Sequence, residues 1–134
     1  MSATSAYDEA AARVRRPPAT ESRDDRDLVR LASLAASSHN TQPWTFTIAP
    51  DSIAIRADLS RRCPVVDPDD AHLYKSLGCA TENLVQAARA RGIAPDVSVD
   101  PATATITVAL DQLVDREPNP LSEAIVTRQC TRGS

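Results

Sequence analysis

The sequence predicts an α+β domain in which helices pack on a small, mainly antiparallel sheet. Apolar residues recur at helical spacing in some segments and alternate with polar residues in others, and 134 residues give room for one domain. Because 42% of the residues are hydrophobic but only 3% are aromatic, we expect an aliphatic core rich in alanine. Such a core buries little apolar area per residue, which favours completion by a partner chain.

The first ordered element is predicted to be a helix over residues 22–36. Residues 1–20 mix Ala, Arg, Pro and Ser, so we expect there a frayed helix or a disordered segment. Acidic residues over 22–27 suit the start of a helix. The polar run 37–43 should end it, because Ser and Asn compete for backbone hydrogen bonds and Pro has no N–H. The expected apolar face consists of Leu28, Leu31, Ala32 and Ala35.

Two pairs of strands are predicted from alternating patterns. Isoleucine and phenylalanine alternate with other residues over 46–48 and 53–56, which indicates a hairpin with its turn at 49–52. A second pair is expected over 97–99 and 104–110, joined near Asp100-Pro101.

The longest helical pattern runs over residues 69–91 and should stop at Gly92. The acidic run 67–70 precedes it. That run either stabilises the helix N-terminus or chelates a metal, and we favour the first. Residues 111–120 are expected to be a linker, followed by a short helix over 121–127. The expected face of the long helix consists of Leu73, Leu77, Ala80, Leu84 and Ala87.

Charge and composition exclude several classes. The net charge of −3 and the scarcity of aromatic residues argue against a nucleic-acid partner. No apolar run approaches the roughly 20 residues that span a bilayer, so we expect no membrane partner and a cytoplasmic protein. His39 and His72 lie on different elements, and three widely spaced cysteines lack metal spacing. No metal site and no disulfide framework are therefore expected.

A polar turn at residues 36–44 carries the strongest local signal. Its side chains include two hydroxyls, from Ser37 and Ser38, and two amides, from Asn40 and Gln42. Amides can pair with the C=O and N–H groups at the edge of a heteroaromatic ring. The simpler alternative is a helix stop followed by Trp44, the first anchor of a strand.

The run Ser-Ser-x-Asn-x-Gln-Pro-Trp at residues 37–44 resembles the signature turn of the FMN-dependent nitroreductase family. Residues 78–92, with Gly-x-Ala-x-x-Asn-Leu and Ala-Ala, resemble the central dimer-core helix of that family. Residues 64–70 and 128–132 resemble more specifically the first lobe of the twin-lobed, Acg-like NAD(P)H nitroreductases. The resemblance covers residues 24–132.

This resemblance implies a partial nitroreductase-like fold with a long central helix as dimer core, and it implies a set of FMN contacts. It implies ring contacts from Ser37, Ser38 and Asn40, with Gln42 also counted among the cofactor-binding residues, and phosphate contacts from Arg128 and Arg132. The chain departs from the family pattern at Ala36, where proline is usual, and at Cys130, where a hydroxyl would donate. A frayed basic C-terminus is the alternative for residues 128–132.

The phosphate-type segment follows the polar turn, whereas a simple module has the reverse order. This order fits a first lobe over residues 21–110, a linker over 111–120, and the start of a second lobe over 121–134. We therefore expect a truncated chain or a short natural variant, which forms a homodimer or pairs with a completing chain.

The activity that the resemblance implies is hydride transfer from NAD(P)H through FMN to a nitro, quinone or similar acceptor. No side chain is a candidate for acid or base catalysis. The alternative is a catalytically inactive lobe that dimerises, sequesters flavin, or does both. Whether the chain is an enzyme stays open at this stage.

Overall fold

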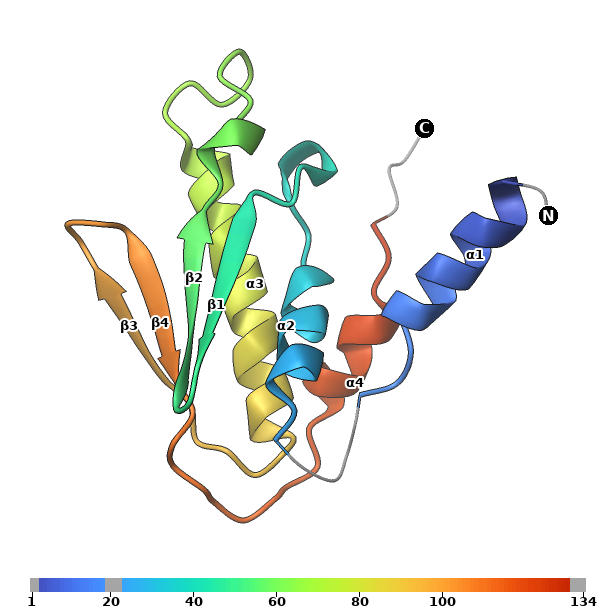
Figure 1. The fold of residues 1–134 in the computed structure, drawn as a ribbon, viewed down its shortest axis with the longest axis vertical. Coiled ribbons are helices and arrows are strands. Elements are labelled where there is room, and N and C mark those ends of the chain that lie inside the picture. The colour runs from blue at the N-terminus through green and yellow to red at the C-terminus, as the bar shows by residue number, and fades with distance from the viewer. Residues whose placement is uncertain (1–2, 19–22, 131–134) are drawn as a thin grey trace.

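The computed structural model describes residues 3–18 and 23–130, and it is an α+β structure (Figure 1). The helices of the described part are α1 (Ala3–Val14), α2 (Asp25–Ser33), α3 (Ala71–Arg89) and α4 (Pro120–Thr127). Its strands are β1 (Trp44–Ala49), β2 (Ser52–Ala57), β3 (Asp96–Asp100) and β4 (Thr105–Ala109). Two short 3₁₀ helices occur at Ser38–Asn40 and Leu59–Arg61.

The four strands form one antiparallel sheet in the order β1-β2-β4-β3. Both predicted hairpins are confirmed. In the first, Ala49 pairs with Ser52 across a two-residue turn. The pairing of β2 with β4 joins the hairpins, so that Ile53 lies opposite Val108 in the middle of the sheet. Ile53, Ile55 and Val108 are fully buried, which places the core on the face that carries them.

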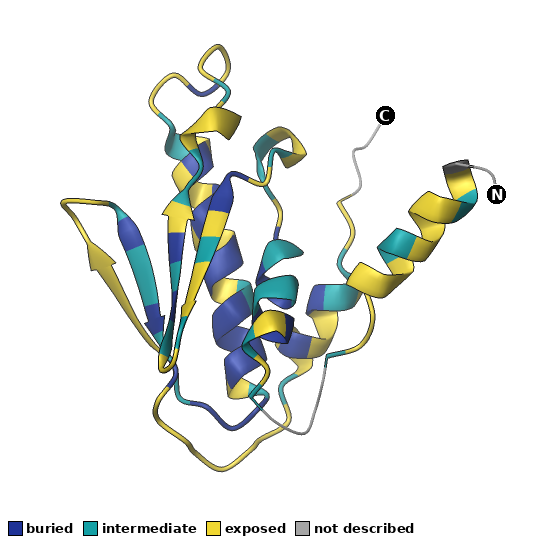
Figure 2. Ribbon diagram, in the orientation of Figure 1, coloured by how far each residue is buried: buried dark blue, intermediate teal, exposed yellow. Residues whose placement is uncertain are grey.

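Helix α3 packs against β2 and β4 of the sheet, and α2 and α4 pack against α3 (Figures 1 and 2). The predicted apolar face of α3 is confirmed, because each of its five residues is buried. The core is aliphatic with several alanines, as composition predicts, and its one well-buried aromatic side chain among the described residues is Trp44. Within the described part of the chain, no helix is both long enough and apolar enough to cross a bilayer.

Helix α2 is shorter than the predicted range of 22–36. It begins at Asp25 because the Asp24 carboxylate accepts the N–H groups of Arg26 and Asp27, each at 3.1 Å. It ends at Ser33, and the N–H of Leu34 closes its last turn.

The segments at either end of the sequence also form helices. Helix α1 extends away from the rest of the molecule, and most of its residues are exposed (Figure 2). Helix α4 buries Ile125 and packs against α3.

A buried cluster of charges joins α2 to the segment after α3. Asp27 is 1% exposed and Arg91 is 7% exposed. Arg91 Nη2 donates to Asp27 Oδ2, while Arg30 Nε and Arg16 Nη2 donate to Asp27 Oδ1 at 2.8 and 3.3 Å. Burial lowers the pKa of Arg91, and Asp27 and Asp24 oppose that effect. The Asp27 carboxylate therefore links α2 to the segment that follows α3.

The end of α3 depends on Gly92, as predicted. Gly92 has φ +73°, and a Cβ there would lie 2.7 Å from the carbonyl oxygen of Val114. The N–H of Val114 donates to the Gly92 carbonyl at 2.8 Å. The segment predicted as a linker therefore begins by running directly against the end of α3.

The start of α3 is capped from a distance. Asp67, 4% exposed, accepts the N–H of His72 at 3.0 Å and that of Leu73 at 2.9 Å. This confirms that the acidic run serves the helix N-terminus. Burial raises the pKa of Asp67, but these N–H groups and nearby His72 together lower it further, so its pKa lies below the usual value.

We expect Asp67→Asn to destabilise the protein at pH 7, because a neutral amide replaces a carboxylate that accepts two N–H groups. Since the folded pKa is depressed, the ionised carboxylate contributes stability above the unfolded pKa of about 3.9. That contribution is lost as the pH falls through the folded pKa. Urea unfolding from pH 7 to pH 2 should show the difference between wild type and variant shrinking below pH 4. A difference that stays constant with pH would contradict this assignment.

Candidate functional site

Residues 37–42 form a tight turn between α2 and β1. His39, Asn40 and Gln42 have φ of 51°, 54° and 50°, the left-handed region that side chains other than glycine rarely adopt. Hydrogen bonds hold this backbone in place. The N–H of Asn40 donates to the Ser37 carbonyl and the N–H of Gln42 to Ser37 Oγ, both at 3.0 Å. The turn is therefore fixed internally, although Ala36 takes the place of the expected proline.

Helix α3 anchors the turn through Ser76, which sequence reasoning missed. The N–H of Ser38 donates to Ser76 Oγ at 3.1 Å, and the Ser76 hydroxyl donates to the His72 carbonyl at 2.7 Å. Ser76 is 4% exposed. A signal existed, because Ser76 falls beside Leu77 and three residues after Leu73 on the buried face of the helix.

The turn displays polar groups that the described residues leave unpaired. Asn40 and Gln42 are exposed, and within the described part of the chain neither amide nor the Ser38 hydroxyl makes a hydrogen bond. Ser37 Oγ accepts one bond and keeps its proton to donate. The four predicted residues of the turn are thus brought together as a set of donors and acceptors.

A hollow of about 310 Å³ borders the turn. Ser37 and Ser38 form one side, and Lys75 and Cys79 of α3 are among the residues that form the other. Lys75 is exposed and adds a positive charge beside the turn. Its position on α3 next to the turn was not signalled by any sequence pattern.

The guanidinium of Arg128 lies at the end of α2, where it is engaged. Nη2 donates to the Leu34 carbonyl at 2.9 Å and Nη1 contacts Cys130 Sγ at 2.8 Å. Leu34 ends α2, where a cation is favourable, and precedes Ser37 by three residues. Arg128 Nε is buried without a hydrogen-bond partner among the described residues. Arg132, the second predicted phosphate ligand, lies outside the described residues.

Over residues 3–18 and 23–130, no three His, Cys, Asp or Glu side chains are grouped as metal ligands. The turn itself offers hydrogen bonding by amides and hydroxyls, beside the positive charge of Lys75.

No protein-family model matches the chain. Two proteins of Mycobacterium tuberculosis, from strains CDC 1551 / Oshkosh and ATCC 25618 / H37Rv, are each named "Putative NAD(P)H nitroreductase" and are 38% identical to it over 69 residues. The match covers 50% of this chain and 20% of each relative. This similarity agrees with the family resemblance of the sequence.

We expect Gln42→Gly to be more stable than Gln42→Val, the reverse of the order at ordinary backbone positions. A β-branched residue is strained at positive φ and glycine is not, so the valine variant should be less stable by about 1 kcal/mol or more. Urea unfolding measures both. Gln112 is an exposed glutamine that is not among the residues of positive φ. At this control position the valine variant should be the more stable one, because glycine makes the unfolded chain more flexible. The same ranking at both positions would contradict the left-handed geometry.

Proposed function

We propose that this chain is the FMN-binding part of a nitroreductase-type oxidoreductase that passes hydride from NAD(P)H to a nitro, quinone or similar acceptor. The observation that carries the proposal is the fixed turn at residues 37–42, where the Asn40 amide and the Ser38 hydroxyl have no partner among the described residues. The similarity to two relatives named as NAD(P)H nitroreductases supports it. The match spans 20% of each relative, so we propose the acceptor and the partners without direct support from these relatives.

The donor set of the turn fits the edge of a flavin ring. An amide donates and accepts at once, and hydroxyls adapt to either need, so Ser37, Ser38, Asn40 and Gln42 can pair with the C=O and N–H groups of such a ring. Bound FMN would supply the hydride chemistry. The protein's part is to bind and orient the ring. Because hydrogen bonds hold the turn before any ligand arrives, little ordering is needed on binding.

The described residues offer fewer contacts for the phosphate of FMN than for its ring. Arg128 donates one hydrogen bond to the Leu34 carbonyl and one to Cys130 Sγ, which leaves the buried Nε–H and one N–H on each terminal nitrogen for another acceptor. The Cys130 thiol is a weaker donor than a hydroxyl. These two features of Arg128 and Cys130 support the second candidate function, a catalytically inactive lobe that dimerises, sequesters flavin, or does both.

We extend the proposal to a dimer formed through α3. Tyr74 is 44% exposed on this helix, and a Cβ added at exposed Gly78 would meet nothing within 4 Å. A helix with a glycine on an exposed face allows a partner helix to approach closely. The partner is a second copy of the chain or a completing chain.

Asn40→Ala should weaken FMN binding about tenfold, because one or two ring hydrogen bonds are lost at roughly 1 kcal/mol each. Quenching of flavin fluorescence measures the dissociation constant. Gln112→Ala removes a comparable exposed amide away from the turn and should leave that constant unchanged. Asn40→Ala should weaken the binding of riboflavin, which lacks the phosphate, to the same degree.

A protein that takes up neither FMN nor riboflavin would contradict the proposed function. Equal affinities in wild type and Asn40→Ala would remove the turn from the site. Bound FMN without oxidation of NADPH or NADH in the presence of a quinone would favour the inactive, flavin-sequestering lobe over the enzyme.

A further inference from the structure

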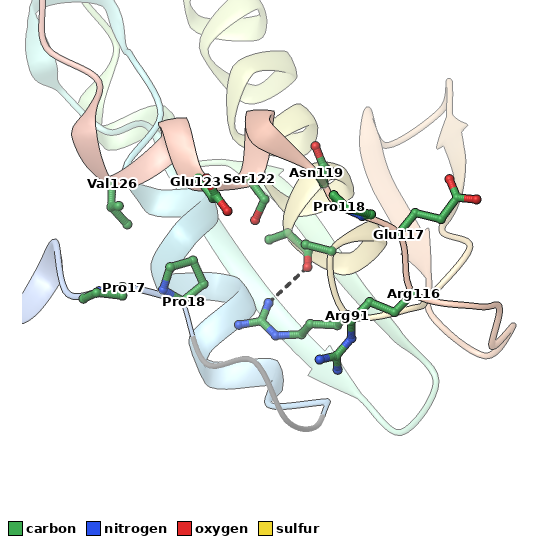
Figure 3. A pocket seen from close by; sticks show the side chains of 12 residues that line it. Pro17, Pro18, Arg91, Arg116, Glu117, Pro118, Asn119, Ser122, Glu123 and Val126 are labelled. Carbon is green, nitrogen blue, oxygen red and sulfur yellow. Dashed lines mark hydrogen bonds between the residues drawn. The ribbon is translucent and has the colours of Figure 1, made fainter.

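A second cavity, of about 650 Å³, lies between α3 and α4 (Figure 3). Ala87, Ala90 and Arg91 border it on the α3 side, and Ser122 and Val126 border it on α4. Its volume is typical of pockets that hold small organic ligands. Ala87 lies eleven residues beyond Ser76, so the cavity is about 16 Å along α3 from the anchor of the polar turn. It is thus separate from the site proposed for FMN.

The walls of this α3–α4 cavity are mainly apolar and built from short or rigid side chains. Ala87 and Ala90 leave room where α4 crosses α3, because neither side chain reaches into the space. Proline rings form other parts of the wall: Pro17, Pro18 and Pro118. Flat apolar surfaces of this kind suit a ligand with a flat apolar body.

Ser122 supplies a buried polar group that points into the cavity (Figure 3). The residue is 2% exposed. Its N–H donates to the Asn119 carbonyl at 3.1 Å, but its hydroxyl has no hydrogen bond to any described residue. Because this hydroxyl faces the cavity, a ligand that accepts its proton would give it a partner there.

Arg116 supplies a cation at the opening. Its exposed side chain extends toward the cavity in Figure 3, and it forms no ion pair or hydrogen bond with the described residues. Arg91, deeper in the same cavity, is held by Asp27 and by the Ala87 carbonyl. Asp27 also contacts the guanidinium groups of Arg16 and Arg30.

Two acids also border the cavity. Glu117 points away from it, and Glu123 lies exposed on α4 (Figure 3). The charge nearest the Ala87 wall is that of Arg91. Arg91 and Arg116 favour an anionic ligand, and the Ser122 hydroxyl can donate to it.

We propose that the α3–α4 cavity is a binding site for a small organic anion with a flat apolar body and one carboxylate. The apolar body lies against Ala87, Ala90 and the prolines. The carboxylate pairs with Arg116 and accepts the proton of the Ser122 hydroxyl. No step of the proposed flavin chemistry depends on this site.

The test uses 2-naphthoate as probe, with 2-naphthamide as its neutral counterpart and 2-naphthylmethylamine as a cation, each measured by calorimetric titration. Wild type should bind the carboxylate more tightly than the amide and the amide more tightly than the amine. Arg116→Gln should lower the affinity for 2-naphthoate about tenfold and leave the affinity for 2-naphthamide unchanged, because only the carboxylate gains a charge-assisted hydrogen bond. Arg13→Gln removes the same charge from exposed α1 and should change nothing.

Two variants test the interior of the cavity. Ser122→Ala should weaken binding of 2-naphthoate severalfold and leave the stability of the protein nearly unchanged, since the hydroxyl makes no hydrogen bond to a described residue. Ala90→Leu should abolish binding of all three probes by filling the space. Binding of 2-naphthoate that survives Ala90→Leu, or that is unaffected by Arg116→Gln, would overturn the proposal, as would tighter binding of the amine or no binding of the carboxylate.

Discussion

The buried carboxylate of Asp27 is the constraint on which the rest of the structure depends. The core is aliphatic and rich in alanine, and such cores tolerate repacking when their total volume is kept. Asp27 adds direction, because its two oxygens receive guanidinium groups from Arg16, Arg30 and Arg91. Removing one partner of a buried pair leaves an uncompensated charge, which typically costs about 3–5 kcal/mol. The position of α2 against α3 is thereby fixed.

Both proposed sites follow from that arrangement. Helix α2 leads directly into the polar turn, which α3 then anchors through Ser76 near one end. At the other end of α3, Arg91 donates a hydrogen bond to Asp27 and also borders the α3–α4 cavity. The left-handed residues of the turn would be costly in a flexible loop, and they are tolerated here because both ends of the turn are held. One long helix thus supports a proposed flavin-facing turn and a separate anion site.

Local patterns predicted the elements well and their long-range contacts poorly. The face of α3, the two hairpins, the stop at Gly92 and the capping role of Asp67 follow from spacing and residue type within a few positions. The contact of Arg128 with Leu34 crosses 94 positions, and that of Arg91 with Asp27 crosses 64, so no local rule identifies the partners. A signal was nevertheless present, because Arg91 continues the buried spacing of Leu84 and Ala87. A charged residue in phase with an apolar face predicts a buried ion pair, although not its partner.

The most direct test of the central claim is a double-mutant cycle between Asp27→Asn and Arg91→Met, measured by urea unfolding. If the pair fixes α2 against α3, its coupling free energy should be about 2 kcal/mol or more, as for buried groups in contact. The cycle of Asp27→Asn with Arg16→Met should give less than about 1 kcal/mol, because the Arg16 side chain is 61% exposed. Effects of the Asp27 and Arg91 substitutions that simply add, within about 0.5 kcal/mol, would contradict the claim.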